Sequence, residues 1–144
     1  MKAFRTLISE KKSSGIPYRY AHRIGYAFWK EGKYKEAEYY FNEQIRIGTE
    51  SIKLGGIYAI SKASHFDLAG TYAFLGDKEK AYQYLDEMNT DFNSWGLIPY
   101  IKYDCLFDSI RNEERFQKIL QNVEAKYQAE HERVRNWLEE QGML

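Results

Sequence analysis

Three histidines carry most of the chain's potential for acid–base or metal chemistry. His22, His65 and His131 are far apart in the sequence, so no spacing typical of a metal site or an acid–base pair joins them. His65 and Asp67 form the nearest charged pair, but side chains two positions apart on a helix point to different faces. The sequence also lacks a phosphate-binding glycine loop, a His-Glu-x-x-His pair and a Gly-x-Ser-x-Gly nucleophile motif. We therefore expect a non-enzymatic protein with no catalytic residue, no metal and no cofactor.

The single cysteine, Cys105, excludes an internal disulfide and a zinc site built from cysteines. Its neighbours Asp104 and Leu106 are acidic and apolar, which does not stabilise a thiolate, so we expect a small buried hydrophobe. No apolar run approaches the length of a membrane span, and no charged-then-apolar leader is present. These features predict a soluble, cytoplasmic protein that does not act at a membrane, or a segment of a longer chain with the same character.

One spaced set of residues occurs twice, 44 positions apart, and predicts how the chain is built. The first copy is Ile24, Gly25, Phe28, Gly32, Ala37 and Phe41, and the second is Leu68, Ala69, Tyr72, Gly76, Ala81 and Leu85. Small residues at two positions of each copy let two antiparallel helices approach closely, while the large residues fill the space beside them. The glycine that ends each first helix can take the left-handed conformation at no steric cost. The pattern therefore predicts two stacked helix pairs.

This pattern resembles that of the tetratricopeptide repeat family, over about residues 18 to 90. The chain departs from it in three ways. The usual period is about 34 residues, so a longer helix or an inserted segment must absorb the extra length. Gln44 stands where the family pattern favours alanine, and the proline that commonly closes a repeat is missing. The resemblance implies an all-α fold of antiparallel helical hairpins, an α-solenoid fragment, which acts as a scaffold for protein–protein interaction.

At 144 residues the length predicts a single domain. Its expected parts are an N-terminal helix at 1–15, a first repeat at 17–48, a second repeat at 50–90, and a capping segment with a long C-terminal helix at 91–144. Within the repeats we expect helices at about 17–31 and 34–48, with the last repeat helix at about 78–89.

The stretch between the repeats allows two interpretations. Gly55-Gly56 is unfavourable within a helix, at about 1 kcal/mol per glycine relative to alanine. The chain could form one long, weakened helix, or a short helix followed by a break and a restart near Ile57. Because the apolar spacing of Ile57, Ile60, Ser64 and Leu68 continues smoothly into the second copy, we favour an extended helix.

The C-terminal part predicts a cap. The segment 99–116 resembles the tail that follows the last repeat in many bacterial tetratricopeptide proteins, and it carries no catalytic residue. A final helix is expected at about 112–140, because apolar residues recur there at alternating four- and three-residue steps. Its first half would cap the second repeat, and its end would either pack on the protein's own surface or pair with a second copy. In a homodimer, which is the alternative function, Val134, Trp137 and Leu138 would be shared.

Charge is distributed unevenly along the chain. Residues 1–35 hold nine Lys or Arg against two Glu, which gives +7, and the remainder carries −7. This asymmetry could attract an acidic partner or another copy, or it could reflect solvated helix faces. A helical repeat with tyrosines in a basic segment could also bind RNA. However, a pI of about 6.8 lacks the basic balance of a dedicated nucleic-acid domain, so we expect no nucleic-acid partner.

The resemblance also locates a binding surface, because the first helices of such repeats line the concave face. The expected partner-binding residues are Arg19, His22, Tyr26, Trp29, Lys30, Phe66 and Phe74. A subclass of the family grips a peptide's carboxylate with lysine and asparagine, but His22 and Tyr26 occupy those places, so we expect no such clamp. An aromatic groove with a basic edge would suit a peptide or helix with apolar anchors and acidic residues. Alternatively, the chain's own ends cover Trp29, Phe66 and Phe74.

Overall fold

A computed structural model describes residues 20–89 and 98–144 of the chain. These residues form helices and no strand, which confirms the all-α class. The elements are α2 (Ala21–Lys30), α3 (Tyr34–Leu54), α4 (Ile57–Ile60), α5 (Ala63–Leu75), α6 (Lys78–Asn89), α7 (Ile98–Tyr103), the 3-10 helix η2 (Cys105–Phe107) and α8 (Glu114–Glu140). The helix expected at 1–15 and the binding residue Arg19 lie outside the described residues. None of the described helices combines the length and apolar character that a membrane span requires.

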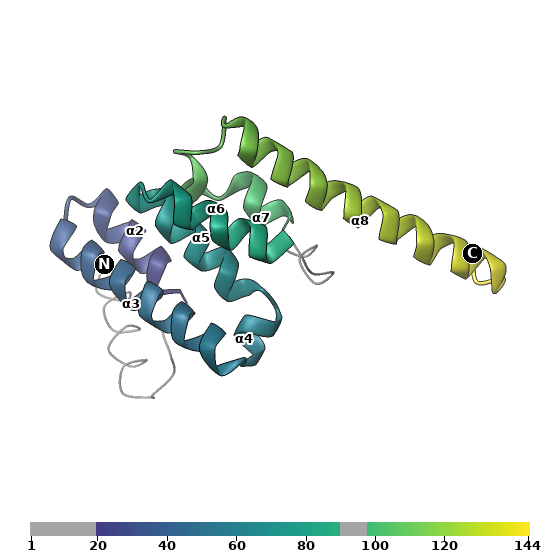
Figure 1. Cartoon of the computed structure of the whole chain (residues 1–144), viewed down its shortest axis with the longest axis horizontal. Helices are drawn as coiled ribbons and strands as arrows, with labels where there is room; N and C mark the ends of the chain where they lie inside the picture. Colours follow the sequence, from purple (N-terminus) through teal and green to yellow (C-terminus); the bar gives the residue numbers. More distant parts are fainter. Residues whose placement is uncertain (1–19, 90–97) are drawn as a thin grey trace.

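Helices α2 and α3 pack against each other across a short turn (Figure 1). Gly32 closes α2 with a φ of +74°, the left-handed conformation predicted for it. The close approach of the two helices depends on Gly25, where an added Cβ would lie 3.1 Å from the carbonyl oxygen of Ala37 and 3.2 Å from the ring of Phe41. A small residue is therefore needed at this crossing.

Helices α5 and α6 form a second pair, with Gly76 in the left-handed conformation between them at a φ of +87°. Helix α6 matches the predicted span 78–89. Ala69, Ala81 and Leu85 are fully buried in one apolar cluster. The two pairs meet where α3 packs on α5.

Helix α3 differs from the prediction, because it does not stop near Gly48 but continues to Leu54. An added Cβ at Gly48 would lie 2.7 Å from Cγ of Leu68 in α5, so this glycine allows a close helix crossing rather than ending a helix. The favoured single extended helix after it is also wrong. Gly55 adopts a φ of +64° and ends α3, and Lys62 adopts a φ of +60° between α4 and α5. Two left-handed residues thus isolate α4 as one short turn.

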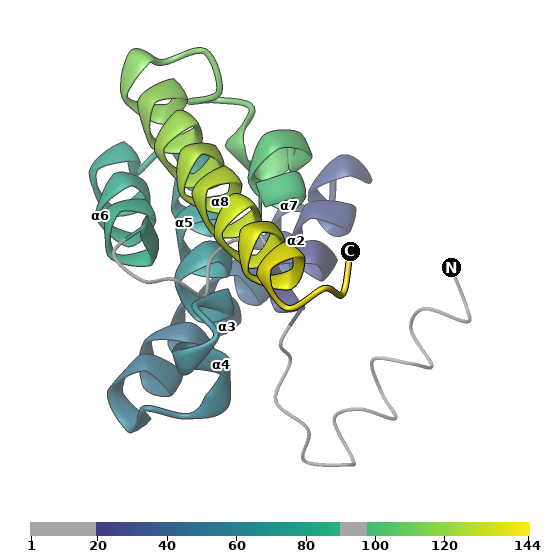
Figure 2. The same ribbon diagram turned by 90° about the vertical axis from the view of Figure 1, so that its right-hand side faces the viewer.

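The C-terminal segment completes the core of the second pair. Helix α8 lies over α5 between α6 and α7 (Figure 2), and its bounds agree closely with the predicted 112–140. Phe107 of η2 is fully buried and contacts both Phe66 of α5 and Phe116 of α8, with ring centroids 5.5 Å apart in each case. The short η2 segment therefore supplies a core residue that contacts both α5 and α8.

Candidate functional site

An exposed group of aromatic side chains lies where the end of α2 meets the end of α5. We call Tyr26, Trp29, Lys30 and Phe74 the Trp29 surface. The ring of Trp29 meets Phe74 edge-on, with centroids 5.1 Å apart and planes at 89°, and Tyr26 meets Phe74 at 5.5 Å and 76°. Such edge contacts fix ring orientation. Trp29 nevertheless remains 42% exposed, so the neighbouring rings hold in place a large apolar side chain that is open to solvent.

A pocket of about 320 Å³ opens beside Trp29. Its lining residues are Trp29, Tyr34, Ala37, Glu38, Phe41, Asn42, Phe74 and Leu75. Ala37 and Phe41 are buried and form an apolar floor, whereas Glu38 and Asn42 are exposed polar residues at the rim. An apolar site with a few polar groups at its edge is typical of ligand-binding pockets.

The Trp29 surface carries a positive charge at one side. The ammonium of Lys30 lies 5.9 Å from the ring centroid of Tyr26 and 6.0 Å from that of Trp29, at the outer limit of a cation–π contact. Tyr26 also lies beside Cys105, and a hydrogen bond to the thiol raises the pKa of Tyr26. Cys105 is half-buried, so it is more accessible than the small buried hydrophobe expected there.

Two of the expected binding residues are not available to a partner. Phe66 is buried, because its ring packs against Phe107 and lies 6.4 Å from that of Tyr100. The C-terminal segment therefore covers this part of α5, as one of the two interpretations of the groove anticipated. His22 is 1% exposed, so its expected place on an open groove is also corrected. Tyr26, Trp29, Lys30 and Phe74 remain as the accessible group.

His22 belongs instead to a closed ring of four polar side chains from α2, α3, α4 and α5. His22 Nδ1 lies 2.8 Å from Gln44 Oε1, and Gln44 Nε2 donates to the Tyr58 hydroxyl at 3.0 Å. Tyr58 donates in turn to the carboxylate of Asp67, whose other oxygen lies 3.4 Å from His22 Nε2. The hydrogen bonds that join His22 to Gln44, Gln44 to Tyr58 and Tyr58 to Asp67 hold the four helices in register.

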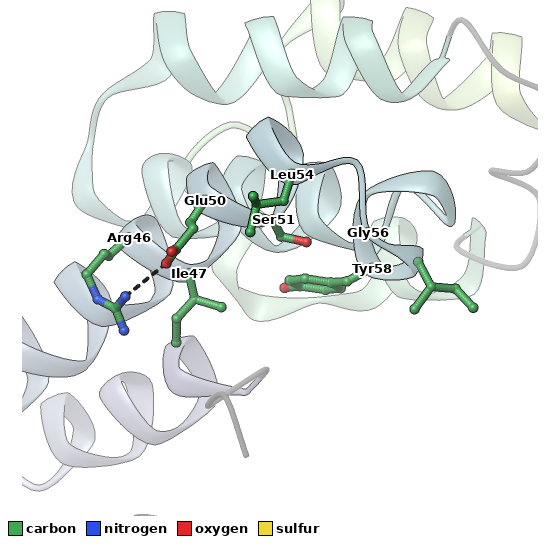
Figure 3. A pocket seen from close by; sticks show the side chains of 8 residues that line it. Arg46, Ile47, Glu50, Ser51, Leu54, Gly56 and Tyr58 are labelled. Carbon is green, nitrogen blue, oxygen red and sulfur yellow. Dashed lines mark hydrogen bonds and ion pairs between the residues drawn. The ribbon is translucent and has the colours of Figure 1, made fainter. Parts of the chain in front are cut away.

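A second pocket, of about 420 Å³, lies where α3 ends and α4 begins (Figure 3). Ile47 and the ring of Tyr58 face it from within, and Arg46 and Glu50, joined at 3.1 Å, stand at its edge. This pocket was not expected from the sequence. The available signal was Gly55-Gly56 between two apolar residues, since a break there turns neighbouring side chains outward: Leu54 is 75% exposed and Ile57 is 81% exposed.

The residues expected at a dimer surface lie in the distal half of α8. Val134 and Trp137 are 40% and 50% exposed, and Leu138 is half-buried. Figure 1 shows this half of the helix extending beyond the rest of the described chain. Among the described residues, the end of α8 therefore extends past the rest of the chain, and both expected arrangements stay predictions.

His65 and Asp67, close neighbours in the sequence, have different partners in the structure. His65 pairs with Glu87 at 3.6 Å while Asp67 faces His22, so the two neighbours do point apart. No group of three His, Cys, Asp or Glu side chains in residues 20–89 and 98–144 could hold a metal ion. Comparison with protein-family models, curated proteins and solved structures finds no match to the chain.

Proposed function

We propose that the chain is a non-catalytic protein–protein interaction module that binds a peptide or helix at the Trp29 surface. The observation that carries the proposal is the exposed Trp29, fixed by Phe74 and Tyr26 beside an apolar pocket. Ordered, partly exposed aromatic residues are enriched among the residues that dominate binding energy. Because the rings are already in position, little conformational freedom is lost when a partner binds.

The proposed fold family is that of the tetratricopeptide repeats. Two helix pairs with glycine turns and small residues at the crossings support it. The bound segment would place one large apolar side chain in the pocket beside Trp29. An acidic residue next to this anchor would face Lys30.

A randomised 12-residue peptide library displayed against the full chain tests this function. We expect enrichment of peptides with an aromatic or large aliphatic residue flanked by Asp or Glu. The best peptide, made synthetically, should bind the Trp29→Ala variant at least about tenfold more weakly, because truncating a dominant contact removes more than about 1.4 kcal/mol.

The variant Ile57→Ala is a matched control, since it truncates an exposed apolar side chain at the other pocket. It should bind the peptide as the wild type does, and far-ultraviolet circular dichroism should show both variants folded. The proposal fails if no peptide is enriched, or if Trp29→Ala leaves binding unchanged. A loss confined to Ile57→Ala would move the site to the pocket between α3 and α4.

A further inference from the structure

Helix α8 is longer than the body on which it packs. Its proximal half buries Phe116, Leu120 and Val123 against the second helix pair. Steps of three and four residues carry the same face on to Val134 and Trp137. The Val134 side chain is 40% exposed and that of Trp137 is 50% exposed, and both lie on a segment that projects away from the body (Figure 1). This face is thus covered in its first half, includes the buried Glu130, and is exposed at Val134 and Trp137 in its second half.

An open face of this kind favours a partner for physical reasons. Most helices in proteins depend on tertiary packing for their stability, and the distal half of α8 extends past the surface on which the proximal half packs. A narrow apolar stripe at three- and four-residue spacing is the pattern by which two helices pack along their length. The shape of the surface therefore fits another helix better than a compact ligand.

We propose that the distal half of α8 pairs antiparallel with the same segment of a second copy of this chain. In the register we assign, Val134 lies opposite Trp137 of the second copy, and Trp137 lies opposite its Val134. The two-fold axis passes between positions 135 and 136, so the bodies lie at opposite ends of the paired helices and do not meet.

Charge complementarity selects this partner and this register. Arg133 and Glu140 are exposed and lie seven positions apart on one flank of the stripe. In the proposed register Arg133 of each copy faces Glu140 of the other, which gives two symmetric ion pairs. Arg133 already donates to Glu130 through Nε and one terminal nitrogen. Since a guanidinium has five N–H donors, it can also bind the second copy.

The stripe also contains Glu130, which must be accommodated. In the antiparallel register its carboxylate faces the amide of Gln141 of the second copy, a possible hydrogen-bond donor. A parallel pairing would instead place the two Glu130 carboxylates opposite each other and Arg133 opposite Leu138. Like charges in facing positions are destabilising, so the same sequence that favours antiparallel pairing opposes the parallel one.

Sedimentation velocity of the full chain over a concentration series tests the proposal. Because the paired segment is short compared with a standard protein interface, we expect a dimer dissociation constant of about 10–100 µM. Val134→Glu should raise this dissociation constant at least about 100-fold, because each copy would then place one unpaired carboxylate in the contact. Asn136→Glu places the same group on the opposite face and should leave the constant within about threefold.

A wild type that stays monomeric at about 1 mM would overturn the pairing. So would equal weakening by Val134→Glu and Asn136→Glu, because the stripe would then not be the contact. Val134 is exposed, so the variant should fold as the wild type does, and circular dichroism checks this.

Mixing two charge variants tests the register itself. Glu140→Arg alone would place arginine opposite Arg133, and Arg133→Glu alone would place glutamate opposite Glu140, so each variant should dimerise at least about tenfold more weakly. In an equal mixture the heterodimer has two attractive ion pairs. One joins the remaining Arg133 to the remaining Glu140, and the other joins the two introduced side chains with their charges reversed. Recovery of dimer in the mixture supports the antiparallel register, whereas dimers no stronger than those of either variant alone would refute it.

Discussion

The buried ring of His22, Gln44, Tyr58 and Asp67 depends on which atoms carry protons. Gln44 Oε1 accepts the backbone N–H of His22 at 3.3 Å and faces Nδ1 of the same residue at 2.8 Å. An amide oxygen only accepts hydrogen bonds, so Nδ1 is the protonated nitrogen. Burial lowers the pKa of His22 to about 4, opposed by the hydrogen bond to Gln44. At pH 7 the imidazole is therefore a neutral donor within the core.

This lowered pKa predicts acid destabilisation. Between pH 6.5 and 4 the unfolded chain binds a proton at His22 that the folded chain does not bind, so the free energy of unfolding falls as the pH falls. The full effect, reached below pH 4, is about 3 kcal/mol for a depression of this size. Urea unfolding at pH 7, 5.5 and 4 measures the slope of stability against pH.

Two matched variants separate His22 from the other titrating groups. His22→Gln removes the titration and should flatten the slope between pH 6.5 and 4, even though it lowers stability at pH 7 by disturbing the ring. His131→Gln makes the same change at an exposed position and should keep the wild-type slope. Parallel slopes for wild type and His22→Gln would contradict a buried neutral imidazole.

At the scale of single residues, the sequence showed that Gln44 departs from the expected pattern but not which residues it contacts. Gln44 was recognisable as polar where a small apolar residue was expected. Its partners could not be foreseen, because His22, Tyr58 and Asp67 lie on three other helices that only the fold brings together. The Trp29 surface was more accessible to prediction, since the repeat pattern that the sequence resembles places Tyr26, Trp29 and Phe74 on the outward side of the first helix of each repeat. The burial of Phe66 depended on where a distant segment docks.

At the scale of elements, glycines with opposite roles decide where α3 and α5 lie. Gly48 is buried inside α3, and its missing side chain leaves room for Leu68 of α5. Gly55, at a φ of +64°, ends the same helix. Residue type alone does not separate these roles, because a glycine signals both helix ends and close approaches. For that reason the sequence predicted α2, α6 and α8 but misplaced the end of α3 and the break before α5.

Gly48→Val should be strongly destabilising. A Cβ at this position would lie 2.7 to 3.0 Å from three carbons of Leu68, which is itself fully buried, so the helices must separate or Leu68 must leave its rotamer. We expect a loss of about 2–3 kcal/mol in the free energy of unfolding, the upper range for overpacking a core. Chemical denaturation measures the loss directly.

Gly56→Val provides the matched control for Gly48→Val. Gly56 has an extended conformation, at a φ of −69° and a ψ of 170°, and an added Cβ would have no neighbour within 4 Å. Its replacement should change stability by no more than about 0.5 kcal/mol. If Gly48→Val behaved in the same way, the close crossing of α3 and α5 would be wrong.

At the scale of the whole molecule, two adjacent residues of η2 connect the apolar clusters of the helix pairs. Leu106 packs in one cluster with Ala37 and Phe41 of α3, while Phe107 is central to the cluster formed by α5, α6 and α8. Arg23 of α2 holds the same segment through an ion pair with Asp104, whose carboxylate also accepts the backbone N–H of Leu106 at 3.0 Å. The C-terminal segment therefore binds both pairs at once.

This connection predicts that the described chain unfolds as one cooperative unit. Phe107→Ala should lower the free energy of unfolding by about 3–5 kcal/mol, because it removes a fully buried ring and leaves a cavity.

Native-state hydrogen exchange gives the decisive measurement. The amides of Phe41 in α3 and Leu85 in α6 should lose protection by the same amount, although only the cluster around Leu85 contains Phe107. Tyr103→Ala, at a 75% exposed ring of the same segment, should leave both amides unchanged. Faster exchange at Leu85 alone would show two independent units, and η2 would then cap the second pair without coupling it to the first.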